Sequence, residues 1–141
     1  MITAKECQAR YGDPRKEKSM VVWPTPTTLH VGKIPGKVYC NKDLVEPLRK
    51  ALANVVARDL VAEIKTWDGC FCIRGKVGGT SSSLHSWGVA IDINAATNGF
   101  GKKPTMSKAL VACFTDAGLE WGGVWSKPDG MHFQLAHFPT K

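Results

Sequence analysis

The strongest pattern of apolar and polar residues in the chain is a stripe between residues 43 and 58. Apolar side chains recur there every three or four positions, which is the period of an amphipathic helix. The residues of this stripe are Leu44, Leu48, Leu52, Val55 and Val56. We therefore predict a helix from about Asp43 to Arg58 that buries this face.

Two shorter helices are predicted from the signals at their ends. Thr3 and Glu6 have the spacing of a capping box, so the first of these helices is expected at about residues 3–11. The second is expected at about residues 107–117, and Gly118 closes it.

Short apolar runs predict three strands. They are Phe71–Arg74, Val89–Asn94 and Met131–Ala136. Because side chains alternate faces along a strand, Asp92 shares a face with the small residues Gly88 and Ala90. In the last strand, His132 and Gln134 likewise alternate with apolar residues. Each of these two strands therefore has a core face and a polar face.

The irregular alternation of strands and helices predicts an α+β fold with a small, mainly antiparallel sheet flanked by helices. A chain of 141 residues, 43% of them hydrophobic, has the usual size of one domain. We expect a single domain over residues 1–141. Residues 1–40 hold its first helix and a Pro-rich wrap, with irregular structure from Val21 to Lys37.

Asp92 and two histidines form a candidate metal site. A carboxylate buried without a partner is costly, so Asp92 needs a cation, a set of donors or a metal ion. If the second and third strands are neighbours, His132 approaches Asp92, and His85 reaches in from the turn before the second strand. Two imidazoles and one carboxylate are a ligand set of catalytic zinc sites, which leave the fourth position to water. Non-haem iron oxygenases use the same ligand types, but they usually place the first histidine and the carboxylate much closer in sequence than His85 and Asp92.

These residues belong to a longer pattern that resembles the M15 family of zinc peptidases. The pattern consists of Ser83, His85, Gly88, Ala90 and Asp92, followed downstream by Asp129, Gly130, Met131 and His132. The family includes D-alanyl-D-alanine carboxypeptidases of the vancomycin-resistance type and phage endolysins that cut between L-alanine and D-glutamate. The resemblance covers about residues 60–138, the metal-site core, and implies the Hedgehog/DD-peptidase fold. It also implies that His85, Asp92 and His132 bind Zn²⁺ and that Asp129 is the catalytic carboxylate.

Asp129 and Arg74 are the candidate catalytic residues. Water activated by zinc still needs a base to accept its proton and an acid to pass that proton to the leaving amine, and one carboxylate can do both. Gly130 would permit a tight turn that holds Asp129 beside the metal; the competing interpretation is an ordinary reverse turn over residues 127–130. By the resemblance, Arg74 stabilises the oxyanion or holds substrate, which suits the fixed donors of a guanidinium. Otherwise Arg74 is a surface residue.

Ser83, Trp87 and Trp125 are the candidate substrate-binding residues. By the resemblance, Ser83 donates a hydrogen bond to a substrate carboxylate, although serines of such a polar tract are often only solvated. Large aromatic side chains near a groove can pack against peptide or sugar, and burial in the core or cleft wall is the competing interpretation. Gln134 stands where several relatives carry glutamate, and its amide oxygen is expected to orient His132.

The formal net charge is +7, from 19 basic and 12 acidic residues, and it draws the protein toward polyanions. The sequence contains no recognised nucleic-acid-binding motif, so we expect no specific nucleic-acid partner. The expected partners are the stem peptides of bacterial peptidoglycan and the anionic envelope surface. We expect the protein to act as a monomer.

The first residues lack the apolar core of a signal peptide, and no apolar run is long enough to span a membrane. We therefore expect the protein to stay in the cytoplasm of a host bacterium until it is released to the wall or periplasm. The five cysteines are odd in number, which favours free thiols. Cys70 and Cys72 are assigned to strand packing.

These features predict a zinc-dependent peptidoglycan peptidase. The preferred interpretation is a phage endolysin that cleaves the L-alanyl-D-glutamate bond of the stem peptide and so lyses the wall. The main alternative is a D-alanyl-D-alanine carboxypeptidase of the same family. A non-catalytic wall-binding module and a non-haem iron oxygenase are the alternatives from other classes.

Overall fold

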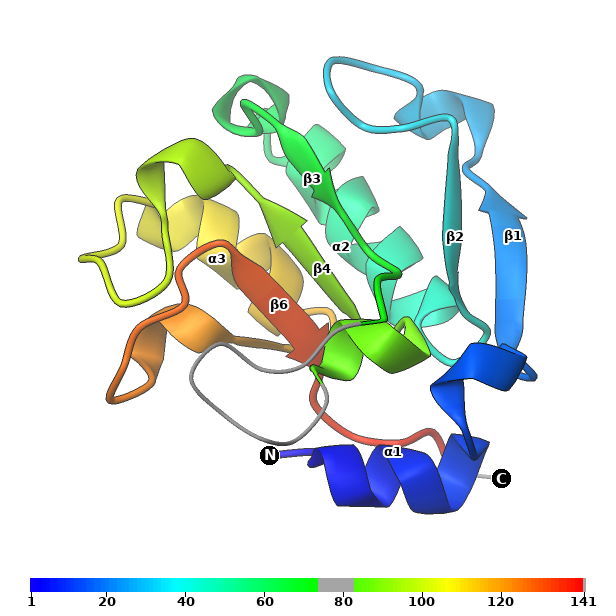
Figure 1. Ribbon diagram of the computed structural model, residues 1–141. Coiled ribbons are helices and arrows are strands. Elements are labelled where there is room, and N and C mark those ends of the chain that lie inside the picture. The colour runs from blue at the N-terminus through cyan, green and yellow to red at the C-terminus, as the bar shows by residue number, and fades with distance from the viewer. Residues whose placement is uncertain (74–82, 141) are drawn as a thin grey trace.

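The computed structural model describes residues 1–73 and 83–140, and its centre is a four-stranded sheet (Figure 1). The strands of this sheet are β3 (Trp67–Gly69), β4 (Ala90–Ile93), β5 (Leu119–Trp121) and β6 (His132–Leu135). Their order is β3-β4-β6-β5, and every neighbouring pair is antiparallel. A separate antiparallel pair consists of β1 (Met20–Pro24) and β2 (Lys37–Asn41).

Two helices, α2 (Val45–Ala57) and α3 (Lys108–Thr115), pack on one face of the four-stranded sheet (Figure 1). The apolar stripe of α2 meets the inward side chains of β4 and β6, and Phe114 of α3 stacks on Phe133 with ring centroids 4.4 Å apart. The fully buried residues of this core include Leu48, Leu52, Val55, Ile91, Ile93, Leu110, Phe114 and Phe133. Burial of these side chains supplies the main driving force for folding, and it leaves the opposite face of β4 and β6 for polar residues.

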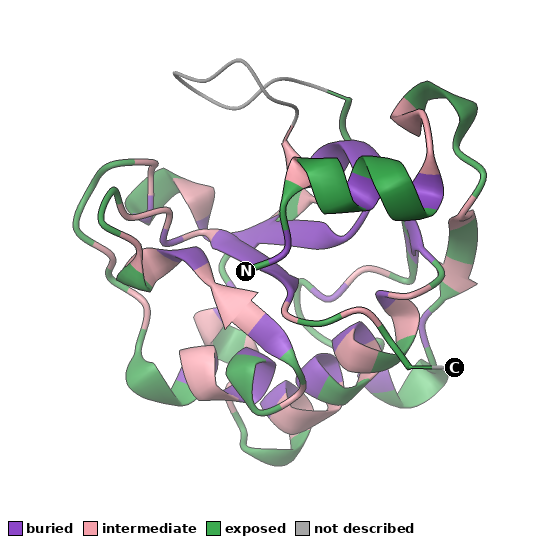
Figure 2. Ribbon diagram, turned by 90° about the horizontal axis from the view of Figure 1, so that it is seen from below, coloured by how far each residue is buried: buried purple, intermediate pink, exposed green. Residues whose placement is uncertain are grey.

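The first helix, α1 (Ala4–Tyr11), packs near the other end of β4 and β6 and closes a second, smaller apolar cluster. Thr3 caps this helix, and its capping box with Glu6 is formed as predicted. Figure 2 shows α1 largely exposed on its outer side, whereas its residues Cys7 and Tyr11 are buried. This arrangement anchors α1 beside the segment that precedes β4.

Short 3₁₀ helices connect the main elements. They are η1 (Pro14–Lys16), η2 (Thr27–Leu29), η3 (Val61–Glu63), η4 (Leu84–Trp87), η5 (Ala95–Thr97) and η6 (Gly122–Val124). Within the described residues, no helix has the length and apolar character needed to cross a membrane.

The predicted α+β class is confirmed, and the three predicted helices lie within about two residues of the expected positions. The predicted strand at Phe71–Arg74 is wrong. Residues 71–73 form no strand, because the backbone N–H of Cys72 donates to the carbonyl of His85 and not to a sheet neighbour; Arg74 lies outside the described residues. The strand that pairs with β4 is β3, slightly earlier in the chain.

The expectation of irregular structure from Val21 to Lys37 is also corrected at its ends. Residues 20–24 form β1, and Lys37 begins β2. Pro24 is tolerated in β1 because it occupies the last position of the strand, where its missing N–H does little harm. All five cysteines are free, as expected. Cys70 is buried in the main core, but Cys72 is exposed, so the packing role assigned to Cys72 is wrong.

Candidate metal centre

The register between β4 and β6 brings two of the candidate ligands together. Asp92 lies directly opposite His132, and the neighbouring pair is Ile91 opposite Phe133. Because Ile91 and Phe133 belong to the core beneath the sheet, alternation places Asp92 and His132 on the face away from α2 and α3. The predicted separation of a core face and a polar face therefore positions the site.

His85 reaches the same place from η4, the turn that precedes β4. Ser83 caps this turn by accepting a hydrogen bond from the backbone N–H of His85 (3.3 Å). Gly88 ends the turn with φ 69°, a left-handed conformation that favours glycine. A Cβ at Gly88 would also lie 2.8 Å from the backbone nitrogen of Asn41. The close approach of η4 to the end of β2 thus requires glycine and fixes the direction of His85.

The three side chains converge on one small volume. Nε2 of His85 lies 3.1 Å from Oδ1 of Asp92, and Nδ1 of His132 lies 3.4 Å from the same oxygen. One ligand atom of each residue lies within 4.8 Å of the others, and all three residues are buried. Two ligands of a tetrahedral zinc ion, each about 2 Å from it, are roughly 3.3 Å apart. The donor set and its spacing therefore fit a divalent metal such as zinc.

Each histidine is held by a hydrogen bond on the ring nitrogen that faces away from Asp92. Nδ1 of His85 lies 2.7 Å from the carbonyl oxygen of Cys70, so it carries a proton and leaves Nε2 free to bind a metal. Nε2 of His132 lies 2.8 Å from Oε1 of Gln134, which leaves Nδ1 for the metal. Such partners orient ligand histidines and set their tautomers. The geometry agrees with the orienting role that the sequence predicted for Gln134.

The charges of the site are strongly coupled. Burial by itself raises the pKa of Asp92, but hydrogen bonds and positive charge from His132 and His85 outweigh burial and hold the pKa of Asp92 well below its usual range. Burial by itself lowers the pKa of His132, but its hydrogen bond and charge interaction with Asp92, helped by Gln134 and the charge of Asp129, raise the pKa above its usual value. Without a metal, the site therefore favours a proton on His132 beside an ionised Asp92.

Asp129 stands next to the three ligands without belonging to the set. Its Oδ2 lies 3.8 Å from Nδ1 of His132, and its side chain is 18% exposed. Backbone hydrogen bonds fix the loop: the N–H of Asp129 donates to the carbonyl of Gly122, and the N–H of His132 donates to the carbonyl of Asp129. A carboxylate in this position can exchange protons with a group bound at the ligands.

Gly130 has a different role from the predicted one. Its φ is not positive, but a Cβ there would lie 2.9 Å from Oδ1 of Asn98 and 3.0 Å from Cβ of Pro104. Glycine is required because the loop that contains Asn98 packs directly against this turn. The turn is thus held by close packing and not by a special backbone conformation.

The candidate ligands and Asp129 lie in the wall of a cavity of about 380 Å³. The described residues that line it are Met1, Ile2, Ala4, Ser83, Leu84, His85, Asp92, Phe100, Trp125, Ser126, Lys127, Asp129, Met131, His132 and Gln134. Ser83 and Trp125 line this cavity, and their substrate-binding role stays a prediction. The ring of Trp125 lies 5.4 Å from that of His132, and its Nε1 donates to Glu120 (3.1 Å). Arg74 lies outside the described residues.

Two lining residues, Phe100 and Lys127, did not stand out in the sequence. The ammonium of Lys127 lies 4.9 Å from the ring centroid of Phe100, within cation–π distance. Lys127 lies two positions before the catalytic candidate Asp129. This closeness in sequence was the one feature that could have indicated that Lys127 lines the cavity. Phe100 belongs to the distant loop that packs on this turn, and nothing in its sequence neighbourhood indicated the contact.

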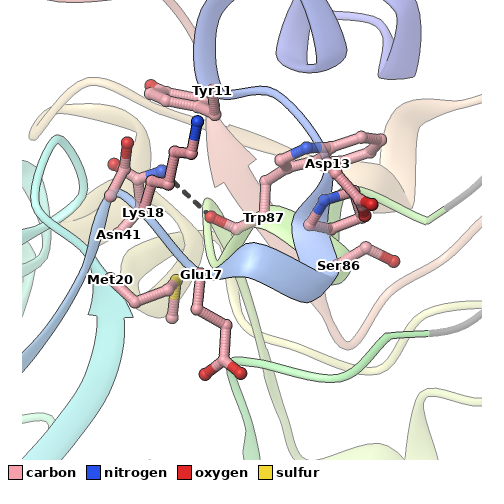
Figure 3. A pocket seen from close by; sticks show the side chains of 10 residues that line it. Tyr11, Asp13, Glu17, Lys18, Met20, Asn41, Ser86 and Trp87 are labelled. Carbon is pink, nitrogen blue, oxygen red and sulfur yellow. Dashed lines mark hydrogen bonds between the residues drawn. The ribbon is translucent and has the colours of Figure 1, made fainter.

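Trp87 does not line this cavity. It is 5% exposed, packs in the apolar cluster under α1, and donates from Nε1 to the carbonyl of Gly12 (2.8 Å). Figure 3 shows it in a separate small pocket, where its carbonyl accepts a hydrogen bond from Asn41 and Tyr11 lies nearby. The packing interpretation holds for Trp87, and the substrate-binding role predicted for it finds no support in its position.

Comparison with known proteins adds one finding. Residues 77–135 match an M15 peptidase family model described as D-alanyl-D-alanine carboxypeptidase. The matched segment spans less than half of the chain. It contains His85, Asp92, Asp129 and His132, so the residues that converge in space are those of the matched M15 segment. The predicted resemblance to M15 peptidases is confirmed over this segment. Searches of curated proteins and of solved structures gave no significant match.

Proposed function

We propose that the protein is a zinc-dependent peptidoglycan peptidase that cleaves the L-alanyl-D-glutamate bond of the stem peptide, as a phage endolysin does. The observation that carries this proposal is the convergence of His85, Asp92 and His132 in one buried cluster beside Asp129. The M15 match over the same residues supports the peptidase class.

His85, Asp92 and His132 would hold the zinc ion. Two imidazoles and one carboxylate leave a coordination position open, which distinguishes catalytic from structural zinc sites. When bound, zinc supplies a Lewis acid that polarises a carbonyl oxygen and lowers the pKa of water. The hydrogen bonds that the two rings donate to the carbonyl oxygen of Cys70 and to Oε1 of Gln134 keep the ligand nitrogens aimed at the ion.

Asp129 moves the proton in this proposal. Its carboxylate accepts a proton from the attacking water as the new carbon–oxygen bond forms, and it returns that proton to the amide nitrogen as the carbon–nitrogen bond breaks. Its half-buried position next to His132 keeps it within reach of the cavity. Proton transfer by such a group contributes about 10²–10⁴-fold to the rate.

The cavity wall suits a peptide that carries carboxylates. Trp125 offers an aromatic surface beside His132, and Lys127 brings a positive charge to the same wall. Both candidate bonds in the stem peptide are followed by a residue with a carboxylate, which an ammonium can attract. The net charge of +7 supports action on an intact, anionic wall, because it concentrates the enzyme at a polyanion by long-range attraction.

A D-alanyl-D-alanine carboxypeptidase is the second candidate, because the matching family model carries that description. Digestion of purified peptidoglycan separates the two functions when the new chain ends are identified by mass spectrometry. The proposal predicts new L-alanine carboxyl ends and new D-glutamate amino ends. Released D-alanine with intact L-alanyl-D-glutamate bonds would establish the second candidate instead.

The metal requirement is tested in the same digest. Wild type is compared with His132→Ala, and elemental analysis measures the zinc content of both proteins. We expect zinc near one equivalent in wild type, and loss of both zinc and hydrolysis in the variant. Full hydrolysis by a metal-free protein would remove zinc from the proposal.

A further inference from the structure

Among the described residues, Gln134 makes hydrogen bonds through only one end of its side-chain amide. It is 2% exposed and lies on β6 two residues after His132, on the same face. Its Oε1 accepts the hydrogen bond from Nε2 of His132. Its Nε2 is also buried, yet it has no hydrogen-bond partner among the described residues. Buried polar groups are nearly always hydrogen-bonded, so this open donor calls for an explanation.

The neighbouring strands do not supply an acceptor. On β5, Glu120 lies opposite Gln134; its Oε2 accepts the indole N–H of Trp125, and it makes no hydrogen bond with Nε2 of Gln134. On β4, the residue opposite is Ala90, whose methyl group has nothing to accept a hydrogen bond. Gln134 lines the cavity of about 380 Å³ together with the candidate metal ligands.

The amide cannot turn around to satisfy its nitrogen elsewhere. If His132 binds a metal through Nδ1, the ring carries its proton on Nε2, and this proton needs an oxygen as its acceptor. Oε1 of Gln134 must therefore stay on His132, which keeps the N–H donors of Nε2 on the remaining side. A ligand that satisfies them must offer an acceptor, and a bound peptide supplies acceptors as its carbonyl and carboxylate oxygens.

We propose that Gln134 is a substrate-binding residue whose amide N–H donates to a carbonyl or carboxylate oxygen of the peptide in the cavity. This inference rests on the proposed peptidase function and extends it. One side chain then contacts substrate through its nitrogen and holds the metal ligand His132 through its oxygen. A glutamate at this position would keep the second contact but would present a carboxylate to the substrate oxygen.

The test separates these two contacts with Gln134→Glu and Gln134→Met. Zinc affinity is measured by competition with a chelator, and kcat and KM are measured on a soluble stem peptide at pH 8. Gln134→Glu retains an acceptor for His132, so we expect zinc affinity within about threefold of wild type but a KM raised roughly tenfold, the worth of one hydrogen bond. Gln134→Met loses both contacts, so its zinc affinity should also fall by about 10–100-fold.

Gln8→Glu is the matched control, because it makes the same change at an exposed position of α1 outside the cavity. Its KM and zinc affinity should equal those of wild type. An unchanged KM in Gln134→Glu, with zinc retained, would show that Gln134 only orients His132 and would overturn the proposal. If wild type cleaves no stem peptide, the proposed function fails. Equilibrium binding of the intact peptide to zinc-loaded wild type and Gln134→Glu then decides the role of Gln134 separately, and equal affinities would refute it.

Discussion

Metal binding at this site should displace a proton from His132, so zinc affinity should depend steeply on pH. The pKa of His132 is raised by its hydrogen bond and charge interaction with Asp92, which outweigh the effect of burial, while the pKa of Asp92 is held low. Zinc binds only the neutral imidazole. Each pH unit below the pKa of His132 should therefore weaken zinc binding by a factor of ten, or about 1.4 kcal/mol. Because that pKa is raised, the loss should begin above about pH 6.5.

The metal-free protein should respond in the opposite direction. A raised histidine pKa contributes stability that is complete below the unfolded value, about 6.5, and is lost as pH rises through the folded pKa. The lowered pKa of Asp92 contributes stability that is present above about pH 3.9 and is lost only as pH falls toward the folded value. The pair of Asp92 and His132 therefore stabilises the metal-free protein most between about pH 4 and 6.5, whereas zinc stabilises it most at higher pH.

Thermal unfolding with and without a fixed excess of zinc measures both effects. The rise in Tm on adding zinc should be larger at pH 8 than at pH 6, by about 3 °C for each 1 kcal/mol in a chain of this length. His137→Gln removes an exposed histidine and should keep the whole dependence, whereas His132→Gln should lose it. A zinc-induced rise in Tm that is equal at pH 6 and pH 8 in wild type would refute the coupling between Asp92 and His132.

Three further predictions concern the loop between β5 and β6. Asp129→Asn should lower kcat on a stem peptide by about 10²–10⁴-fold with zinc affinity nearly unchanged; a variant with full kcat would exclude proton transfer by Asp129. Lys127→Met should raise KM for a peptide with a free carboxylate next to the cut, while Lys127→Arg keeps it near wild type and an amidated peptide removes the difference; equal KM values in all cases would contradict a carboxylate contact. Gly130→Ala should destabilise the protein by about 1–3 kcal/mol in urea unfolding, because the new methyl group overlaps Asn98 and Pro104, and unchanged stability would show that the two loops separate easily.

The sequence predicted that Asp92 and His132 would meet on one face of the sheet because alternation is a strong constraint. Once Ile91 and Phe133 are assigned to the core, Asp92 and His132 must lie on the other face, and only their register was unknown. His85 was placed by its position just before the second predicted strand, and the family resemblance supported it; the short turn that holds it is not indicated by periodicity.

Other features depended on contacts between distant segments. The strand β3 is only three residues long and contains Gly69, so its pattern was weaker than the apolar run that follows it. The burial of Trp87 depends on α1, and Phe100 reaches the cavity wall through a loop far from the other lining residues. The lack of a partner for the side-chain N–H of Gln134 could not be predicted, because it depends on which residues lie opposite Gln134 on both neighbouring strands.

The register between β4 and β6 determines both the packing of the core and the geometry of the candidate metal site. Inserting or deleting one residue within either strand would move Phe133 or Ile91 to the cavity side and turn a candidate metal ligand toward the core. Substitutions in the connecting loop that holds Trp125 and Lys127 leave this register unchanged. Libraries aimed at new substrates are best directed to that loop, with both strands kept intact.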